Sequence, residues 1–181
     1  MYKRQRIFVE GLPTWCITIA LLHELKPIFG LVYLPTLDDW TYTDGDDVIT
    51  NGNVVTHRLK KRWAADSYIY WRSDAHTIFD LQFTRIAAYG STATHAAYVA
   101  RGAGVATIVH DPYVWDIAAM AAFLAKQGGE IRTLDGDLLD FTKLDLTKSS
   151  NTTYIGAYTE VARRMIPLVQ RRPKIIGHPA W

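Results

Sequence analysis

Two long apolar runs near the N-terminus form the strongest hydrophobic pattern in the chain. Residues 14–22 are continuously apolar or β-branched, and residues 28–34 repeat the pattern after a short polar stretch. Runs of this length joined by a short turn predict two neighbouring strands. Residues 40–43 alternate as a third strand, and Asn51-Gly52 is a hairpin-turn dipeptide before another apolar pair. We therefore predict an antiparallel sheet in the first third of the chain.

From residue 60 onward the pattern changes to short strands that alternate with helices. Predicted strands cover residues 67–71, 85–88, 104–109, 130–134 and 154–157, and predicted helices cover 93–100, a stripe from Ile117 to Leu124, and 159–169. Between the first two of these strands lies a polar segment, about residues 74–80, to which we assign no helix or strand. Alternation of this kind indicates an α/β layer with a parallel or mixed sheet.

Composition bounds the functions that the chain can have. The 181 residues are 49% hydrophobic and 12% aromatic, which is typical of a globular protein with a real core. The net charge of +2 gives no reason to expect nucleic acid as a partner. No apolar run reaches the roughly 18 residues of a membrane span, and the single cysteine, Cys16, suits a reducing compartment. We therefore expect a cytoplasmic protein that contacts neither nucleic acid nor membrane.

One carboxylate stands at a strand-to-helix junction, where α/β proteins commonly place their chemistry. Asp116 directly precedes the helical stripe that begins at Ile117, after an apolar strand and a turn that contains Pro112. Two interpretations are open, because Asp is a preferred N-cap and because a helix N-terminus offers free N–H groups to an anion. Ser91, which precedes the Ala-rich helix 93–100, is also a candidate N-cap.

The order of motifs resembles the inositol monophosphatase family of magnesium-dependent, lithium-sensitive phosphatases. Trp115-Asp116-Ile117-Ala118-Ala119, followed by an Ala-rich helix and Gly128-Gly129, is the most specific match. The other matching segments are Phe8-Val9-Glu10-Gly11-Leu12-Pro13-Thr14-Trp15-Cys16-Ile17-Thr18-Ile19-Ala20, Gly30-Leu31-Val32-Tyr33-Leu34-Pro35, Asn51-Gly52 and Gly90-Ser91. The resemblance extends from about Arg6 to Arg172.

The resemblance implies a fold and a division of the chain. The fold class is α/β, part of an αβαβα sandwich in which a remnant antiparallel sheet is followed by a mixed sheet flanked by helices. Residues 6–58 correspond to the remnant of the N-terminal sheet subdomain, and residues 59–172 to the C-terminal α/β subdomain. Residues 173–181 have no periodicity and are expected to form a tail.

The resemblance also implies a reaction and its residues. Asp116 corresponds to a ligand of Mg²⁺, whose hard oxygen ligands and charge suit phosphoryl transfer. Gly90, Ser91 and Thr92 correspond to positions that touch the substrate, which is a small phosphorylated molecule. Val109 falls where inositol phosphatases carry a glutamate that contacts substrate hydroxyls, so inositol phosphate is not expected as the main substrate. The family also suggests a possible homodimer.

The family's other metal ligands lie upstream, in a Gly-Glu-Glu segment and in Asp-Pro-Ile-Asp-Gly-Thr. In this register the Asp-Gly-Thr falls on Lys3, Arg4 and Gln5, which cannot replace an aspartate ligand. The catalytic residues are therefore not identified in this sequence. We expect residues 1–5 to be non-native and the reading frame to be truncated, because Met1-Tyr2-Lys3-Arg4-Gln5 resembles a translated transposon-end adaptor. A natural short variant is the alternative.

His110 and Asp111 are adjacent in the sequence and near the proposed site, which suggests a role as general acid and base. Nothing in the sequence orients the imidazole, so we expect a structural or exposed role instead. Two hypotheses for the chain follow. One is a C-terminal fragment of a metal-dependent phosphomonoesterase that is inactive by itself, and the other is a catalytically silent remnant that acts as a subunit or interaction module.

Overall fold

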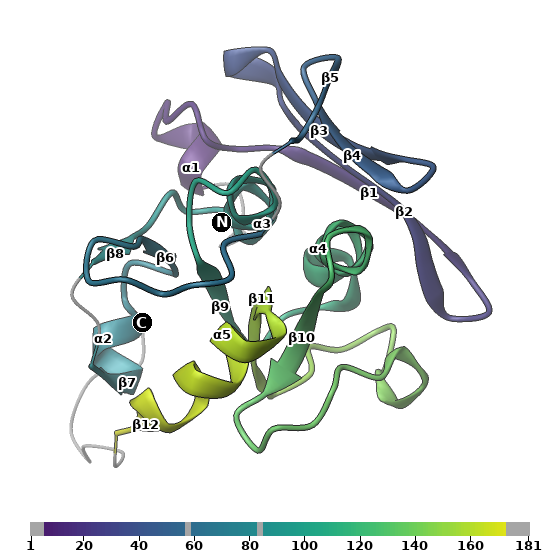
Figure 1. The fold of residues 1–181 in the computed structure, drawn as a ribbon. Coiled ribbons are helices and arrows are strands. Elements are labelled where there is room, and N and C mark those ends of the chain that lie inside the picture. Colours follow the sequence, from purple (N-terminus) through teal and green to yellow (C-terminus); the bar gives the residue numbers. More distant parts are fainter. Residues whose placement is uncertain (1–5, 57–58, 83–84, 173–181) are drawn as a thin grey trace.

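The computed structural model describes residues 6–56, 59–82 and 85–172 and stacks them in four layers (Figure 1). A five-stranded antiparallel sheet (sheet A) is followed by the helices α3 (Thr92–Ala100) and α4 (Val114–Lys126). A five-stranded mixed sheet (sheet B) comes next, and α5 (Thr159–Met165) covers its far face. The predicted α/β class, with an antiparallel sheet and a mixed sheet flanked by helices, is confirmed. The expected boundary at residue 58, the N-terminal five residues and the tail 173–181 lie outside the described residues.

Sheet A forms as the apolar runs predict. Its strands follow one another in chain order, and the first hairpin pairs Ile17 with Tyr33 and Leu21 with Phe29. The Asn51-Gly52 turn joins the last two strands, both residues having positive φ. The strands are β1 (Ile17–His23), β2 (Lys26–Leu34), β3 (Asp39–Asp44), β4 (Asp47–Thr50) and β5 (Asn53–Val54).

Sheet B has the order β10-β11-β9-β6-β8. The pairs of β9 with β6 and of β6 with β8 are parallel, whereas β11 runs antiparallel to both of its neighbours. Its mixed character confirms the second part of the sequence prediction. The strands are β6 (Ile69–Tyr70), β8 (Ile86–Ala87), β9 (Ala106–His110), β10 (Gly129–Thr133) and β11 (Thr153–Tyr158).

Two predicted boundaries are wrong. The polar segment 74–80, to which no element was assigned, contains the short helix α2 (Ala75–Ile78) and the start of β7 (Phe79–Leu81), which pairs with β12 (Val169–Arg171). The helix predicted to run to residue 169 ends at Met165 and continues as η4 (Ile166–Leu168), because Pro167 cannot donate the next helical hydrogen bond. The remaining short elements are α1 (Arg6–Val9), η2 (Pro35–Leu37) and η3 (Phe141–Lys143).

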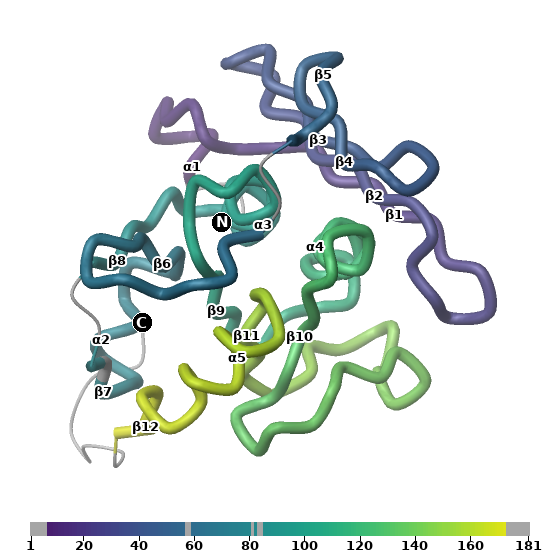
Figure 2. Tube along the Cα trace, viewed as in Figure 1, coloured from purple at the N-terminus to yellow at the C-terminus, as the bar shows by residue number. Residues whose placement is uncertain are grey.

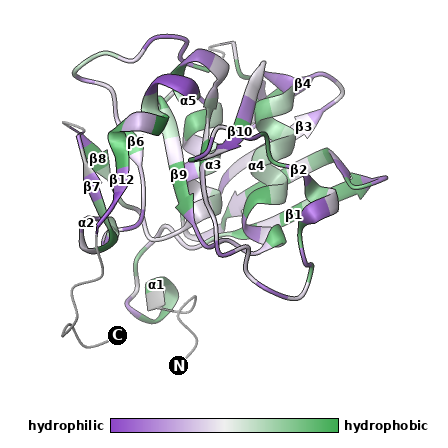
Figure 3. Ribbon diagram, turned by 90° about the horizontal axis from the view of Figure 1, so that it is seen from below, coloured by the Kyte–Doolittle hydropathy of each residue, from purple (hydrophilic) through white to green (hydrophobic). Residues whose placement is uncertain are grey.

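The helical layer is apolar on two sides because it packs between two sheets. Ile117, Met120 and Leu124 of α4 belong to a buried cluster with sheet B, whereas Phe123 belongs to one with Val32 and Leu34 of sheet A. Figure 3 shows α3 and α4 largely green between the sheets. The approach to sheet A is close, since a Cβ on Gly30 would lie 2.7 Å from the Ala119 carbonyl oxygen. Gly30 is therefore required for β2 to approach α4.

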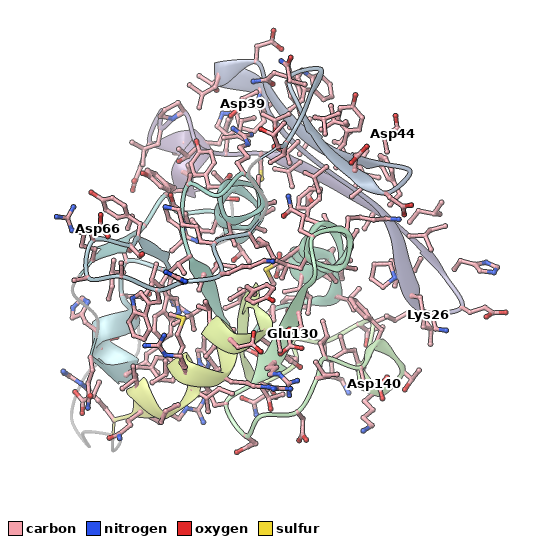
Figure 4. The ribbon with its side chains drawn as sticks, in the orientation of Figure 1. Lys26, Asp39, Asp44, Asp66, Glu130 and Asp140 are labelled. Carbon is pink, nitrogen blue, oxygen red and sulfur yellow. The ribbon has the colours of Figure 1, made fainter. Side chains whose placement is uncertain are left out.

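The opposite face of sheet A, which we call its outer face, is also apolar. Register places its side chains together across three strands, and the β1 members are about half exposed, at 48–56%. Figure 4 places the labelled Lys26, Asp39 and Asp44 at the periphery of this sheet. The outer face consists of Ile17, Ile19, Leu21, Phe29, Leu31, Tyr33, Trp40 and Tyr42.

The outer face is expected to bind a hydrophobic dye. Replacement of Ile19 and Leu21 together by lysine should lower the fluorescence of bound 1-anilinonaphthalene-8-sulfonate several-fold, because it removes two of the most exposed apolar side chains. Leu146→Lys is the matched control, since Leu146 is 54% exposed but lies in the loop before β11. Equal fluorescence from the double variant and the unmodified chain would contradict this prediction.

Candidate functional site

The loop before α3 brings three of the predicted substrate residues to a helix N-terminus. Ser91 is the N-cap, and its hydroxyl oxygen accepts a hydrogen bond from the Thr94 N–H at 3.3 Å. Thr92 is the first residue of the helix, and Gly90 has a φ of +75°. The capping interpretation of Ser91 thus describes the geometry. It does not exclude an anion ligand, because the first N–H groups of the helix lie at the same end.

The segment between α1 and β1 packs against this loop (Figure 2). The Ile7 side chain occupies the space that a Cβ on Gly90 would need, which adds a second reason for glycine there. Thr14 Oγ1 donates to the Tyr89 carbonyl at 2.6 Å, and the Cys16 Sγ lies 3.1 Å from the Ser91 Oγ. Two motifs that are some 75 residues apart in the sequence therefore form one structural unit.

Asp116 lies inside α4, not before it as expected from the sequence. The helix begins at Val114, so Asp116 is its third residue, and Asp116 Oδ2 accepts a hydrogen bond from the Tyr113 N–H at 2.9 Å. The helix starts earlier than the apolar stripe because its N-cap is Tyr113, whose N–H bonds to Asp116 in the first turn. The Asp116 carboxylate still accepts a hydrogen bond from an N–H group at the helix N-terminus, but Asp116 itself lies in the first turn of the helix.

The two helices point the same way. Gln127 Nε2, at the end of α4, donates to the Ala100 carbonyl at the end of α3 at 2.8 Å, and Figure 1 shows both helices end-on side by side. At a rise of 1.5 Å per residue, Ser91 lies about 14 Å from this bond along the axis of α3. Asp116 lies about 17 Å from it along the nearly parallel axis of α4. The structure therefore brings Asp116 and Ser91 to the same end of the helical layer.

Val109, the predicted specificity residue, is buried. It is only 4% exposed and packs in a cluster with Tyr70, Ile117 and Tyr154 between sheet B and the helices. Its side chain does not line an open surface among the described residues. Contact of Val109 with a substrate stays a prediction, and Val109→Glu would bury a carboxylate in an apolar cluster.

His110 is held in place, contrary to the expectation that nothing orients its ring. Its Nδ1 lies 2.8 Å from the Thr153 Oγ1, and its ring packs edge-on against Phe79 at a centroid distance of 5.3 Å. Burial lowers the pKa of His110, and the positive charges of Arg171 and Arg72 lower it further. The imidazole is therefore held neutral near pH 7 and acts as a packed polar link between β9 and β11.

The described residues near Asp116 do not form a complete metal site. Within the parts of the chain that the structure describes, no three side chains of His, Cys, Asp or Glu lie close enough together to hold a metal ion. Mg²⁺ is usually bound by one or two carboxylates together with substrate phosphate and water. Asp116 can supply one such ligand, so the residues present fit part of a magnesium site and not a whole one.

Two surface hollows lie away from this site. One of about 360 Å³ lies beside the loop that leads to β11, lined in part by Thr133, Asp137 and Tyr154. A second, of about 640 Å³, lies between the β1–β2 turn and η3. Neither is lined by Gly90, Ser91 or Asp116. These two hollows are therefore separate from the site at the helix ends.

A family model described as the inositol monophosphatase family matches residues 6–170, which is nearly the whole chain. The chain belongs to the inositol monophosphatase family. The resemblance seen in the sequence is therefore confirmed. Within the described residues, no helix of this family member is long and apolar enough to cross a membrane.

Characterised relatives are longer and distant. A fructose-1,6-bisphosphatase/inositol-1-monophosphatase of Thermotoga maritima is 26% identical over 71% of this chain and 53% of its own length. A histidinol-phosphatase of Mycobacterium tuberculosis is 29% identical over 71% of this chain and 55% of its own length. The chain thus spans about half the length of these curated relatives.

The fold is shared with solved structures of the family. A dual inositol monophosphatase/NADP phosphatase, crystallised with Mg²⁺ and phosphate, superposes with a TM-score of 0.77 at 20% identity. The match covers 93% of this chain and 66% of that one. A Thermotoga maritima inositol monophosphatase gives a TM-score of 0.74, with 91% of this chain and 64% of that one covered. About a third of each of those chains has no counterpart here.

Sequence reasoning missed the residues that hold the site together. Gln127, Thr14 and His95 each bond across a long sequence separation or inside the core. The matching signals are the family-like segment 8–20 for Thr14, the predicted helix 93–100 for His95 and the following Gly128-Gly129 for Gln127, but none of them indicates the partner of the side chain. Their partners are backbone groups. Because nearly every residue carries the same N–H and C=O groups, the sequence does not indicate which of them a side chain will bond.

Proposed function

We propose that this chain forms part of a magnesium-dependent phosphomonoesterase that hydrolyses a small phosphorylated metabolite. The observation that carries the proposal is the position of Asp116, the family's metal-ligand motif, level with the Ser91 N-terminus of the parallel helix α3. Residues 6–172 supply one carboxylate for the metal, so we propose that the chain by itself is inactive. The remaining ligands would come from polypeptide outside the described residues.

Each residue has a proposed role. Asp116 would provide one oxygen ligand to Mg²⁺, and the ion when bound activates water and neutralises charge on the phosphoryl group. Gly90, Ser91 and Thr92 would contact the substrate through the free N–H groups of α3 and the Ser91 hydroxyl. The Ser91 hydroxyl accepts from the Thr94 N–H and lies 3.1 Å from the Cys16 Sγ, so its proton is available to a substrate oxygen when the Cys16 thiol is the donor in that pair.

A silent interaction module is the second candidate. The shortage of metal donors among the described residues favours it, because a single carboxylate does not make a useful magnesium site. The outer face of sheet A gives such a module an apolar surface. The DNA upstream of codon 1 separates the two candidates: an in-frame Asp-Pro-Ile-Asp-Gly-Thr supports the enzyme, and a start codon within a complete gene supports the module.

The substrate is proposed to be something other than inositol monophosphate. Val109 offers no acceptor for substrate hydroxyls, and a site that lacks such an acceptor gains little from a polyol. We also propose a cytoplasmic location, in keeping with the single cysteine, Cys16, which is free. The homodimer suggested by the family stays a prediction.

The experiment joins this chain to the part of the Thermotoga maritima relative that it does not match, and measures phosphatase activity with Mg²⁺. We expect hydrolysis of histidinol, sugar or nucleotide phosphates with kcat/KM values at least equal to that for inositol monophosphate. Val109→Thr is a usable variant, since it preserves the size of the buried side chain. A preference of about tenfold or more for inositol monophosphate, unchanged in Val109→Thr, would reject the proposed role of Val109.

A further inference from the structure

The hollow beside the loop that leads to β11 contains a nearly buried hydroxyl that no residue pairs. Tyr154 of β11 is 5% exposed and lines this hollow, whose volume is about 360 Å³. Among the residues that the structure describes, none forms a hydrogen bond with the Tyr154 hydroxyl, and yet this oxygen is not fully enclosed, as the unpaired Thr107 Oγ1 is. The small exposed part of Tyr154 therefore includes its hydroxyl. A polar atom of a molecule in the hollow would satisfy it.

The charges along the same hollow are already balanced in pairs. Two consecutive segments share one pattern, Asp140-Phe141-Thr142-Lys143 and Asp145-Leu146-Thr147-Lys148. In each, the aspartate Oδ1 accepts from the N–H and the hydroxyl of the threonine, at 3.0 and 2.6 Å in the first segment and 2.8 and 2.7 Å in the second. The other carboxylate oxygen lies 3.7 or 3.4 Å from the lysine Nζ. Each segment is thus neutral as a whole and offers no surplus positive charge to an anion.

The remaining groups of the lining suit a neutral molecule with several hydroxyls. Asp137 adds a negative charge, which disfavours a phosphate or a carboxylate in the hollow. Tyr154 and Ser149 supply hydroxyls that both donate and accept, while Leu139 and Leu144 supply apolar surface for C–H groups. Small-molecule sites have volumes of roughly 300–1,000 Å³, so a hollow at the low end of this range suits a single sugar ring.

One wall of the hollow is bonded to the turn that precedes α4. The Ser150 N–H donates to the Pro112 carbonyl at 2.9 Å, and the Asp111 N–H donates to the Thr152 carbonyl at 2.8 Å. Ser150 and Thr152 both line the hollow. The turn leads directly into α4, whose first turn contains Asp116. A molecule that contacts this wall therefore also affects the turn before α4.

We propose that this hollow is a binding site for a small neutral polyhydroxylated molecule, of the size of a monosaccharide or a cyclic polyol, in which the Tyr154 hydroxyl makes the central hydrogen bond. Occupation of the hollow is communicated to the turn before α4 through the Ser150 and Asp111 hydrogen bonds. The site is separate from the Ser91 turn and from Asp116, so it does not depend on the proposed phosphatase function.

The test compares two tyrosine variants of the 181-residue chain. Tyr154→Phe removes only the hydroxyl, and because no described residue bonds to that hydroxyl the Tm should not fall. Tyr158→Phe is the matched control, since Tyr158 lies four residues later on the same face of β11 and packs against the same cluster but does not line the hollow. The probes are D-glucose and myo-inositol as neutral polyols and inorganic phosphate as an anion.

The first readout is the amide shift of Thr152 and Tyr154 during titration with each probe. We expect saturable shifts with at least one polyol and none with phosphate. Loss of one hydrogen bond should raise the Kd about fivefold in Tyr154→Phe, whereas Tyr158→Phe should leave it unchanged. Shifts that do not saturate with either polyol, or an equal Kd in Tyr154→Phe, would overturn the site. Saturation by phosphate at lower concentration than by the polyols would overturn the assignment of a neutral ligand.

The second readout is the Asp111 amide, which lies outside the hollow and bonds to its wall. We expect this amide to shift with the same Kd as the Thr152 amide, and the Kd to rise equally for both in Tyr154→Phe. A saturable shift at Thr152 without one at Asp111 would overturn the connection between the hollow and the turn before α4.

Discussion

Asp116→Asn is expected to lower the magnesium-dependent kcat/KM of the joined protein by on the order of 10³-fold. A metal ligand supports charge stabilisation worth several kcal/mol in the transition state, and each 1.4 kcal/mol is a factor of ten. An amide oxygen is a weaker ligand than a carboxylate, so the metal would be held less tightly. The measurement is a Mg²⁺ titration of phosphatase activity for both forms.

The same substitution should leave the fold intact, which separates the two roles of Asp116. An asparagine Oδ1 can still accept from the Tyr113 N–H, so the free energy of unfolding should fall by no more than about 1 kcal/mol. Asp111→Asn is the matched control, since Asp111 is an exposed carboxylate five residues away that accepts from the Asn151 N–H. Equal activity of Asp116→Asn and the unmodified joined protein would show that Asp116 is only a helix-terminal cap.

The second large effect is on the pH dependence of stability. Burial lowers the pKa of His95 from 6.5 to about 4, so the folded protein holds this imidazole neutral while the unfolded chain protonates it. As the pH falls from 6.5 to about 4, the unfolded state binds one proton more, and the free energy of unfolding decreases. At 1.36 kcal/mol per pKa unit the loss due to His95 is about 3 kcal/mol.

The loss can be isolated by comparison with His95→Gln, which cannot titrate. Urea unfolding of both proteins at several pH values should show that the stability advantage of the unmodified chain shrinks by about 3 kcal/mol between pH 6.5 and 4, because the carboxylates are common to both. His110→Gln should show a smaller change of the same sign, since His110 is only half-buried. A constant difference between the unmodified chain and His95→Gln across this range would contradict the assignment of His95 as a buried neutral base.

Hydrophobic patterning was sufficient to predict both sheets and most of the helices. The continuous apolar runs of β1 and β2 and the Ala-rich α3 are local signals, and so are the Asn51-Gly52 turn and the Ser91 cap. The error at residues 74–80 has a physical cause. There α2 and β7 depend on tertiary contacts, since Ala75 and Phe79 belong to the core under α5 and β7 pairs with the distant β12.

The candidate site could be predicted only in part. Motif order suggested Asp116 and the Gly90–Ser91 turn as site residues, and the helix directions inferred from the Gln127 bond place them at the same end of one layer. The position of Val109 was not predictable, because a strand residue can face either side of its sheet and the register that buries it comes from pairing with Tyr154. His95 and Thr14 were missed because their partners are backbone groups of Tyr89.

The most direct test of the central claim, that this chain carries one ligand of a magnesium site and not a whole one, is a thermal unfolding measurement of the 181-residue protein with and without Mg²⁺. A complete site at 100 times its Kd would add about 2.7 kcal/mol of stability, which corresponds to a rise in Tm of roughly 5–10 °C for a chain of this size. We predict no rise at a few millimolar Mg²⁺. A rise of several degrees that Asp116→Asn abolishes would show that the chain already contains the other ligands.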